Sequence, residues 1–376
     1  MSDETLTSLS LRSLVTDAGE LQLLLKEETI EEPGEHEVVV RIEATPINPS
    51  DQATLIFPAD VSTGSTSGSG AETVYTAQLR PEVKNMVKPR IGKAMRIGNE
   101  GAGTVVRAGS SDAAQALLGK TVAVMDGALY CQYRKVNIMQ CLPLNEGTTA
   151  KEGASSFVNP LTALGMTETM KREGFKAIVH TAAASNLGQM LNRLCQNDGI
   201  DLVNVVRKQS QVDLLKEQGA KYVCNSSDDD FRQQLTEAIA ATGAYVAFDA
   251  TGGGTLASEI LTCMEAAALK TTEARGPYGS DVYKQVYIYG GLDSSPTIIN
   301  RNFGFAWGIN SWLLTPFMQK VGMETVVALR QRVADEINTT FASHYSREIS
   351  LEEALDAEVV AAYSQQATGE KYLITP

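Results

Sequence analysis

The chain has 376 residues, of which 43% are hydrophobic and 20% charged, and its formal net charge is -13 at pH 7. This length allows two domains, and the composition is that of a globular protein rather than a disordered, fibrous or membrane-embedded one. The negative charge disfavours nucleic acid and anionic membranes as partners. Neither a leader-like segment nor an apolar stretch of ~20 residues is visible, so we expect a cytoplasmic protein with no membrane partner.

The first part of the chain is predicted to be mostly β-structure. Residues 21–25 and 37–43 are short alternating runs with Pro33-Gly34 between them, which predicts two antiparallel strands joined by a turn. Residues 62–70 are nearly all Ser, Thr and Gly, which predicts a mobile surface loop inserted into the domain.

Beyond about residue 170, strands alternate with helices, as in a doubly wound parallel α/β sheet. Apolar runs suited to strands covered on both faces lie at 177–181, 202–206, 222–225, 245–249 and 286–289. Apolar residues at three- and four-residue steps predict helices at 187–196, 211–218, 230–241 and 256–269. In the last segment, 348–376, we expect a helix and then a strand at 372–375 that rejoins the first domain.

Cysteine and histidine spacing favours neither disulfides nor a metal site. The cysteines are odd in number, far apart and never in a Cys-x-x-Cys pair, so we expect buried thiols. The three histidines share no ligand-like spacing with the cysteines or with each other. The cysteines are Cys131, Cys141, Cys195, Cys224 and Cys263, and the histidines are His36, His180 and His344.

The turn after the first strand of the α/β region is the expected place for a nucleotide pyrophosphate. It reads Thr181-Ala182-Ala183-Ala184-Ser185-Asn186-Leu187-Gly188, with one glycine where the usual fingerprint has three. Gly188 is suited to close packing of the helix, and Asn186 is expected to take the left-handed backbone conformation. On this turn alone, a nucleotide site and an unliganded turn are equally compatible with the sequence.

The end of the second strand favours a phosphorylated nucleotide. Arg207 and Lys208 stand about 20 residues past Gly188, where an NAD enzyme carries an acid for the ribose hydroxyls. A forked guanidinium can clamp a 2′-phosphate and the lysine adds charge, so the pair predicts NADP(H). The alternative is a solvated pair at a strand end.

Several segments resemble the medium-chain dehydrogenase/reductase superfamily, in the same order along most of the chain. Asn48-Pro49-Ser50-Asp51 resembles its Asn-Pro-x-Asp element, and Gly98-Asn99-Glu100-Gly101-Ala102-Gly103 resembles its Gly-x-Glu-x-x-Gly element. Asn159-Pro160-Leu161-Thr162-Ala163 is similar to the Asn-Pro-x-Thr-Ala element of the enoyl-thioester reductases. Further along the chain, Phe248 to Gly253 resembles the family's fourth Rossmann strand, and Tyr289-Gly290-Gly291 resembles its turn beside the nicotinamide. Thr368 to Lys371 resembles part of the family's C-terminal tail.

The resemblance implies a GroES-like, mostly β catalytic domain at residues 1–160 and 320–376, and a Rossmann NADP(H)-binding domain at 161–319. The active cleft would lie between them, and relatives of this kind are commonly homodimers. The zinc branch has Cys and His where this chain has Pro49-Ser50-Asp51 and Asn99. The chain therefore resembles the zinc-free branch, which contains quinone oxidoreductases and enoyl reductases.

Without a metal to polarise an alcohol, hydride delivery to an electron-poor acceptor is favoured. We expect an NADPH-dependent reductase of a quinone or another small conjugated carbonyl acceptor. Asn48 and Thr162 are the predicted catalytic residues, although a turn-forming Asn and a helix-starting Thr are the simple alternatives. The predicted cofactor-binding residues are Ala184, Ser185, Asn186, Leu187, Gly188, Arg207, Lys208, Asn225, Thr251, Tyr289, Gly290 and Gly291.

The source of the proton stays open. Enoyl-thioester reductases carry a proton-donating tyrosine shortly after the Asn-Pro-x-Asp element, and residues 52–58 contain none. Tyr75 is expected to be a buried structural residue instead, and a quinone can take its proton from solvent. Enoyl-thioester reduction and NADP(H) binding without turnover, as in a redox sensor, are the alternatives. Phe303, Phe305, Trp307 and Trp312 suit either an apolar wall for a flat acceptor or core and dimer packing.

Overall fold

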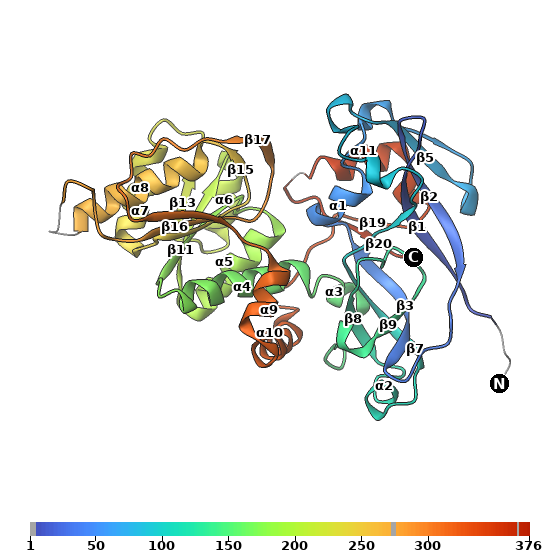
Figure 1. Ribbon diagram of the computed structural model, residues 1–376. Helices are drawn as coiled ribbons and strands as arrows, with labels where there is room; N and C mark the ends of the chain where they lie inside the picture. The colour runs from blue at the N-terminus through green and yellow to red at the C-terminus, as the bar shows by residue number, and fades with distance from the viewer. Residues whose placement is uncertain (1–4, 272–275, 367) are drawn as a thin grey trace. The chain divides into compact units, whose positions relative to one another are not determined.

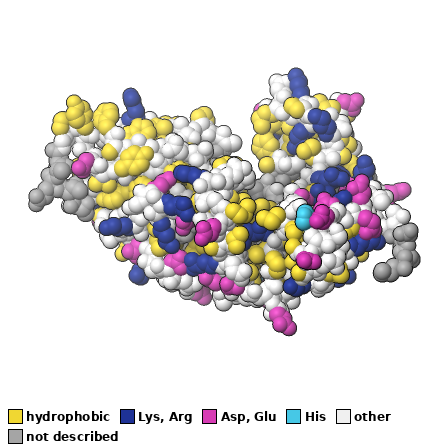
Figure 2. All heavy atoms as spheres, turned by 60° about the horizontal axis from the view of Figure 1, so that its bottom comes forward, with side chains coloured by type: hydrophobic (Ala, Val, Ile, Leu, Met, Phe, Trp, Pro, Cys, Tyr) yellow, Lys and Arg dark blue, Asp and Glu magenta, His cyan; other side chains and the backbone are white. Residues whose placement is uncertain are grey.

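The computed structural model describes residues 5–271, 276–366 and 368–376, and the chain divides into two compact units (Figure 1). Unit 1 comprises Met1–Val158 and Arg330–Pro376, and unit 2 comprises Asn159–Leu329. Among the described residues, no helix is both long enough and apolar enough to cross a bilayer. On the face drawn in Figure 2, acidic and basic side chains are interspersed over the surface.

Unit 1 is built on two sheets. The first has the order β4-β5-β2-β1-β6 with antiparallel neighbours, and the second has the order β10-β8-β7-β3-β20-β19, with β9 also paired to β3. The strands of the first sheet are β1 (Thr7–Val15), β2 (Glu20–Thr29), β4 (Ser65–Ser67), β5 (Val74–Gln78) and β6 (Met95–Arg96). Those of the second are β3 (Glu37–Pro46), β7 (Glu100–Ala108), β8 (Thr121–Met125), β9 (Tyr133–Asn137), β10 (Cys141–Pro143), β19 (Arg347–Ile349) and β20 (Tyr372–Ile374).

Short helices connect these strands. The α-helices of unit 1 are α1 (Pro49–Leu55), α2 (Asp112–Gln115), α3 (Ala150–Gly153) and α11 (Ala357–Ser364). Its 3-10 helices are η1 (Val61–Thr63), η2 (Gly70–Glu72), η3 (Pro81–Val83), η4 (Lys88–Arg90), η5 (Ile138–Gln140) and η6 (Glu353–Leu355). The predicted C-terminal strand is confirmed, because β20 pairs with β3 of the first part of the chain.

The predicted pairing of the first two strands is wrong. The runs at 21–25 and 37–43 do lie in β2 and β3, but β2 pairs with β1 and β5, whereas β3 pairs with β7, β9 and β20. Strand β1 was not predicted because its serines interrupt the apolar pattern. Ser10 and Ser13 are buried, and their hydroxyls donate to the carbonyl oxygens of Lys26 and Leu55 at 3.1 Å each.

The predicted mobile loop at 62–70 is also partly wrong. The segment is mostly exposed, as expected, but it contains strand β4, which pairs with β5. The Thr66 hydroxyl donates to the Leu355 carbonyl oxygen at 2.6 Å, and the Gly70 amide donates to Glu352 Oε1 at 2.7 Å. Hydrogen bonds to a distant part of the chain therefore hold a segment whose composition alone indicates flexibility.

Unit 2 contains a six-stranded sheet with the order β13-β12-β11-β14-β16-β18, in which every neighbouring pair is parallel. Its strands are β11 (Ala177–Thr181), β12 (Asp201–Val206), β13 (Tyr222–Asn225), β14 (Val246–Asp249), β16 (Lys284–Ile288) and β18 (Trp307–Ser311). A separate parallel pair joins β15 (Gly252–Gly254) to β17 (Asp293–Thr297). Strand β18 was missed, but the predicted doubly wound sheet is confirmed.

Helices precede, separate and follow the strands of unit 2. They are α4 (Val158–Arg172), which begins on the last residue of unit 1, α5 (Asn186–Asp198), α6 (Gln209–Glu217), α7 (Phe231–Thr242), α8 (Leu256–Thr271) and α9 (Leu314–Val321). Helix α10 (Met323–Glu336) begins in unit 2 and ends in unit 1. Buried residues of α7 and α8 form the main core with strands β11, β12 and β14. The five cysteines are buried free thiols, as predicted.

Candidate active site

In unit 1, Asn48 lies between β3 and α1, where it is buried. Pro49 follows as the first helical residue, a position that suits proline because the first helical N–H has no partner within the helix. The Asn48 backbone amide donates to Asp51 Oδ2 at 2.9 Å. The first turn of α1 thus holds Asn48 in a capping box, in which Asp51 accepts the Asn48 backbone amide and the Asn48 side chain faces the Asp51 amide.

The Asn48 side chain contacts Glu100, the first residue of β7. Asn48 Nδ2 donates to Glu100 Oε1 at 2.7 Å, and Glu100 Oε2 accepts the amides of Phe157 at 2.7 Å and Val158 at 2.9 Å. Burial raises the pKa of Glu100, and only the ionised carboxylate is restricted to accepting hydrogen bonds, so in that form this contact fixes which way the Asn48 amide points. Asn48 Oδ1 is buried and has no hydrogen-bond partner in the described part of the chain. The site therefore presents an unused acceptor.

Asp51 adds a second buried carboxyl group. Its Oδ1 accepts the Asn99 amide at 2.9 Å, and burial raises its pKa to about 7 against the opposing effect of its backbone hydrogen bonds. Asn99 Nδ2 donates in turn to the Ser50 hydroxyl at 3.1 Å. Among the described residues, no group of three or more His, Cys, Asp and Glu side chains is arranged to hold a metal ion.

Lys371 supplies the positive charge of this cluster. It is buried, its Nζ donates to the Ser155 hydroxyl at 2.7 Å, and the same atom lies 5.6 Å from the centre of the Tyr345 ring. Burial lowers the Lys371 pKa to about 8, although the charges of Glu100 and Asp51 act in the opposite direction. Asp51, Glu100 and Lys371 all lie within the sequence motifs described above, but the motifs alone assigned none of them a role.

In unit 2, the turn between β11 and α5 departs from the expected path. Ala182 has a φ of 50°, so Ala182 and not Asn186 takes the left-handed conformation, and Asn186 is the first residue of α5. The Ser185 hydroxyl caps the helix by accepting the Gly188 amide at 3.1 Å. A Cβ on Gly188 would lie 2.1 Å from the Ala183 carbonyl oxygen, so this position requires glycine.

Arg207 and Lys208 follow β12 directly, and both are exposed. The Arg207 amide donates to Gln211 Oε1 at 3.0 Å, and its carbonyl oxygen accepts the Ser227 hydroxyl at 2.9 Å. Lys208 is the N-cap residue of α6. These contacts use the Arg207 backbone, so the two cationic side chains stand in solvent at the carboxyl end of a parallel strand.

Two further predicted cofactor residues lie at carboxyl ends of neighbouring strands. Asn225 ends β13 and is buried, and its Nδ2 donates to Asp228 Oδ1 at 2.7 Å. Thr251 follows β14, and its amide donates to Asp249 Oδ1 at 2.9 Å. The Asp249 carboxylate also accepts the Thr181 hydroxyl at 2.7 Å, so it ties the ends of β11 and β14 together.

The turn Tyr289 to Gly291 follows β16. The Tyr289 hydroxyl lies 2.8 Å from His180 Nε2, and the two rings stack with centroids 5.8 Å apart. A Cβ on Gly290 would lie 2.6 Å from the Ala250 carbonyl oxygen, whereas one on Gly291 would meet no heavy atom within 4 Å. The predicted cofactor residues of unit 2 thus gather at the carboxyl edge of one sheet.

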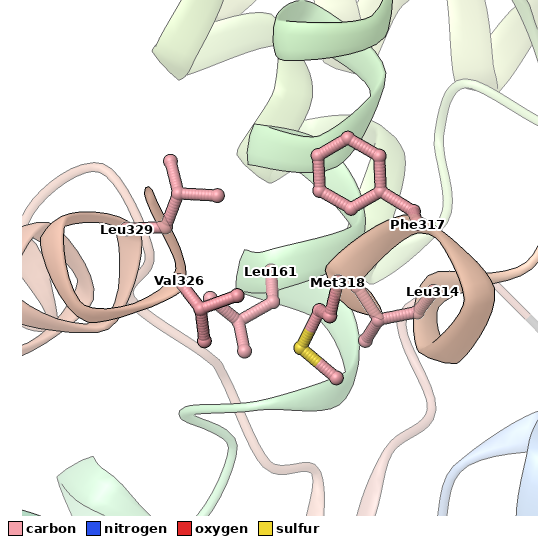
Figure 3. A pocket seen from close by; sticks show the side chains of 6 residues that line it. All are labelled: Leu161, Leu314, Phe317, Met318, Val326 and Leu329. Carbon is pink, nitrogen blue, oxygen red and sulfur yellow. The ribbon is translucent and has the colours of Figure 1, made fainter. Parts of the chain in front are cut away.

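Thr162, the second predicted catalytic residue, lies within α4 and is buried. It is not a helix-starting residue, because α4 begins at Val158. The adjacent Leu161 packs against apolar side chains of α9 and α10 (Figure 3). These side chains are Leu314, Phe317, Met318, Val326 and Leu329.

The four aromatic residues that suit either an apolar wall or core and dimer packing lie in different surroundings. Phe303 is fully buried against Trp307, with ring centroids 5.0 Å apart, and Trp312 donates from Nε1 to the Thr169 hydroxyl at 3.1 Å. Phe305 is 79% exposed. The core-packing alternative therefore holds for Phe303 and Trp312. Tyr75 is also buried, as expected, and burial raises its pKa to about 12.

Comparisons with known proteins agree with this fold. No protein-family model matches the sequence. A structure from Mesorhizobium loti, named as an NADPH:quinone reductase, is 25% identical, with a TM-score of 0.73 and coverage of 100% of both chains. One from Bacillus thuringiensis, also named as an NADPH:quinone reductase, is 18% identical, with a TM-score of 0.73 and coverage of 99% of this chain and 100% of that one. A mutant enoyl thioester reductase from Candida tropicalis is 17% identical, with a TM-score of 0.66 and coverage of 99% and 100%.

Proposed function

Because the chain has the fold of the NADPH:quinone reductase and enoyl reductase structures of the medium-chain dehydrogenase/reductase superfamily, we propose that it is an NADPH-dependent reductase. It delivers hydride to a quinone or another small conjugated carbonyl acceptor and needs no zinc. The observation that carries this proposal is the exposed pair Arg207 and Lys208 at the carboxyl end of β12. An adenosine 2′-phosphate is the ligand that such a pair suits at this point of a Rossmann sheet.

The residues of unit 2 fit NADPH. The Ser185 cap and the first turn of α5 suit a pyrophosphate, because the N-terminus of a helix favours negative charge. Ala184 and Leu187 would line this turn, and Thr251 and Gly290 stand on the neighbouring strands of the same sheet edge. When bound there, NADPH supplies the hydride, and the protein supplies its position and its surroundings.

Asn48 is the proposed positioning group in unit 1. Its Oδ1 is a fixed, unused acceptor, so it suits an N–H or O–H donor of a bound ligand rather than a carbonyl oxygen. We propose that Thr162 contributes a hydroxyl or a backbone group to the same purpose. A quinone takes its protons from solvent in this scheme.

The donor set present in unit 1 supports a zinc-free reaction. Pro49-Ser50-Asp51 and Asn99 stand where the zinc branch has its Cys and His ligands, and Asn99 donates to both Asp51 and Ser50. Catalytic zinc in proteins is held by thiolates, imidazoles and carboxylates, and of these groups the two segments offer only the Asp51 carboxyl. We also propose a cytoplasmic homodimer, with the catalytic domain at 1–160 and 320–376 and the cofactor domain at 161–319.

Steady-state oxidation of NADPH tests the proposal. Purified protein is mixed with NADPH and a panel of simple quinones and enones, with and without a zinc chelator, and a crotonyl thioester is tested in parallel. We expect acceleration by at least one quinone or enone and no loss with the chelator. Turnover of the thioester alone identifies an enoyl-thioester reductase, and no acceleration by any acceptor contradicts a reductase.

A further inference from the structure

Thr181 is the last residue of β11, where the chain enters the nucleotide turn, and it is buried. The Thr181 hydroxyl donates to Asp249 Oδ1 at 2.7 Å, and its oxygen accepts the backbone amide of Ala250 at 2.8 Å. A hydroxyl carries a single hydrogen, so both its donor and its acceptor capacity are used by the end of β14. The register of β11 with β14 ends one residue earlier, at His180 and Phe248. Thr181 therefore continues the connection between the two strands through its side chain.

Three turns at this edge of the sheet are tied to Asp249, which is fully buried. The turn after β11 is tied through the Thr181 hydroxyl. The turn after β14 is tied by its own amides, because Thr251 donates to Asp249 Oδ1 at 2.9 Å and Gly252 donates to Oδ2 at 3.1 Å. The turn after β16 is tied by the Tyr289 amide, which donates to the Asp249 carbonyl oxygen at 3.0 Å. Each of these turns carries at least one of the predicted cofactor residues.

The residue after Thr181 has a backbone conformation that its surroundings must hold. Ala182 has a φ of 50°, which residues with a side chain rarely adopt. Such a conformation persists only where the surrounding structure over-determines it. On one side, the Ala182 carbonyl oxygen accepts the Ser185 amide at 2.9 Å, and the Ala183 amide donates to the Val205 carbonyl oxygen at 3.2 Å. On the other side, Thr181 supplies the anchor to β14.

We propose that Thr181 is a positioning residue for the dinucleotide, whose hydroxyl sets where the nucleotide turn leaves β11 relative to the turns after β14 and β16. It acts through the backbone of the turn from Ala182 to Ser185, which leads into the helix N-terminus suited to a pyrophosphate. NADPH and NADH share the pyrophosphate, so loss of the Thr181 hydroxyl should weaken both by the same factor. Arg207 and Lys208, in contrast, should act on the 2′-phosphate alone. This role rests on the proposed function, because it requires the nucleotide site, but it does not require turnover of any acceptor.

Titration calorimetry of NADPH and NADH with wild type and Thr181→Val tests the proposal. Valine has nearly the shape of threonine but neither donates nor accepts, so the Ala250 amide and Asp249 Oδ1 each lose a buried partner. We expect both dissociation constants to rise about tenfold with their ratio unchanged, and Thr181→Ser, which keeps the hydroxyl, to restore both. Thr236→Val is the matched control and should bind both nucleotides as wild type does. Thr236 is buried in α7, and its hydroxyl donates to the Arg232 carbonyl oxygen of the same helix at 2.7 Å.

Hydrogen exchange of the ligand-free protein gives a second readout that needs no nucleotide. We expect Thr181→Val to raise the exchange rate of the Ala250 amide, and Thr181→Ser to leave it near the wild-type rate, because only the first removes the acceptor. Should Thr181→Val fail to fold, Thr181→Cys takes its place in both experiments. The thiol is a weaker donor and acceptor, so it should give a smaller loss in the same direction.

Three outcomes would overturn the role of Thr181. They are wild-type affinity in folded Thr181→Val protein, a loss of affinity for one nucleotide only, and an equal loss in Thr236→Val, which would show a general effect of destabilisation. Wild-type protein that binds neither nucleotide would instead contradict the proposed function, and the role of Thr181 with it.

Discussion

Asn48 Nδ2 and Glu100 Oε1 are joined by a 2.7 Å hydrogen bond between two buried side chains that lie in different sequence motifs. Glu100→Gln should reverse this bond. The new amide oxygen would take the amides of Phe157 and Val158, its NH₂ would face Asn48, and the Asn48 amide would turn its donor toward the ligand. We expect a folded protein whose kcat/KM falls by at least about tenfold, the cost of one mispaired polar group.

Acceptor reduction measured in parallel with circular dichroism checks this prediction. Glu146→Gln, at an exposed position, is the matched control and should leave both signals unchanged. Normal turnover in the Glu100→Gln protein would show that the direction of the Asn48 amide is unimportant.

The buried carboxyl of Asp51 should make stability depend on pH. Its pKa rises from 3.8 to about 7 on folding, so between these values the folded protein keeps a proton that the unfolded chain releases. Its contribution is therefore full below pH 3.8 and is lost as the pH rises through about 7. The total is on the order of 4 kcal/mol at most.

Urea unfolding of wild type and Asp51→Asn, compared across this pH range, isolates the effect. The variant also disturbs hydrogen bonds to Asn48 and Asn99, but this loss is a constant offset, and the difference in slope reports the titration. We expect the stability of wild type relative to the variant to fall as the pH rises. Parallel curves would mean that Asp51 is ionised throughout.

The left-handed backbone of Ala182 predicts a stabilising substitution. At a φ of 50° the Ala182 Cβ lies too close to the backbone, which costs roughly 1–2 kcal/mol. Ala182→Gly removes this cost, but glycine also raises the conformational entropy of the unfolded chain, which offsets part of the gain in stability. We expect a net gain of up to about 1 kcal/mol in the free energy of unfolding. Ala183→Gly is the control, because Ala183 is fully buried and is not among the residues with positive φ, and it should lose stability. Equal losses in both variants would contradict the strain at Ala182.

The parallel sheet could be predicted from the sequence because its signals are local. Strands covered on both faces are continuous apolar runs, and the predicted bounds 177–181 and 222–225 coincide with β11 and β13. The resemblance to the medium-chain dehydrogenase/reductase fold is confirmed by solved structures that cover 100% and 99% of the chain. Strand β18 escaped because Gly308 and Asn310 break the apolar run of Trp307–Ser311.

The site in unit 1 could not be assembled from the sequence in the same way. Asp51, Glu100 and Lys371 are far apart in the chain, and the pairing of β3 with β7 and β20 brings their segments together. Such pairings are non-local, and the incorrect hairpin between β2 and β3 shows that adjacent strands in the sequence need not pair. Likewise, a residue with left-handed backbone was correctly expected in the nucleotide turn, but at Asn186 rather than at Ala182. The prediction fell on Asn186 because Asn adopts this conformation more readily than Ala.

The binding of NADPH and NADH to wild type and to the Arg207→Ala/Lys208→Ala double variant tests the central claim most directly. Lys216→Ala/Lys221→Ala is the control, because it removes the same charge from exposed positions of the same unit. Titration calorimetry should show that the first double variant weakens NADPH at least about tenfold and leaves NADH nearly unchanged, while the control changes neither. Equal weakening of both nucleotides, or none, would contradict the assignment of this strand end to the 2′-phosphate.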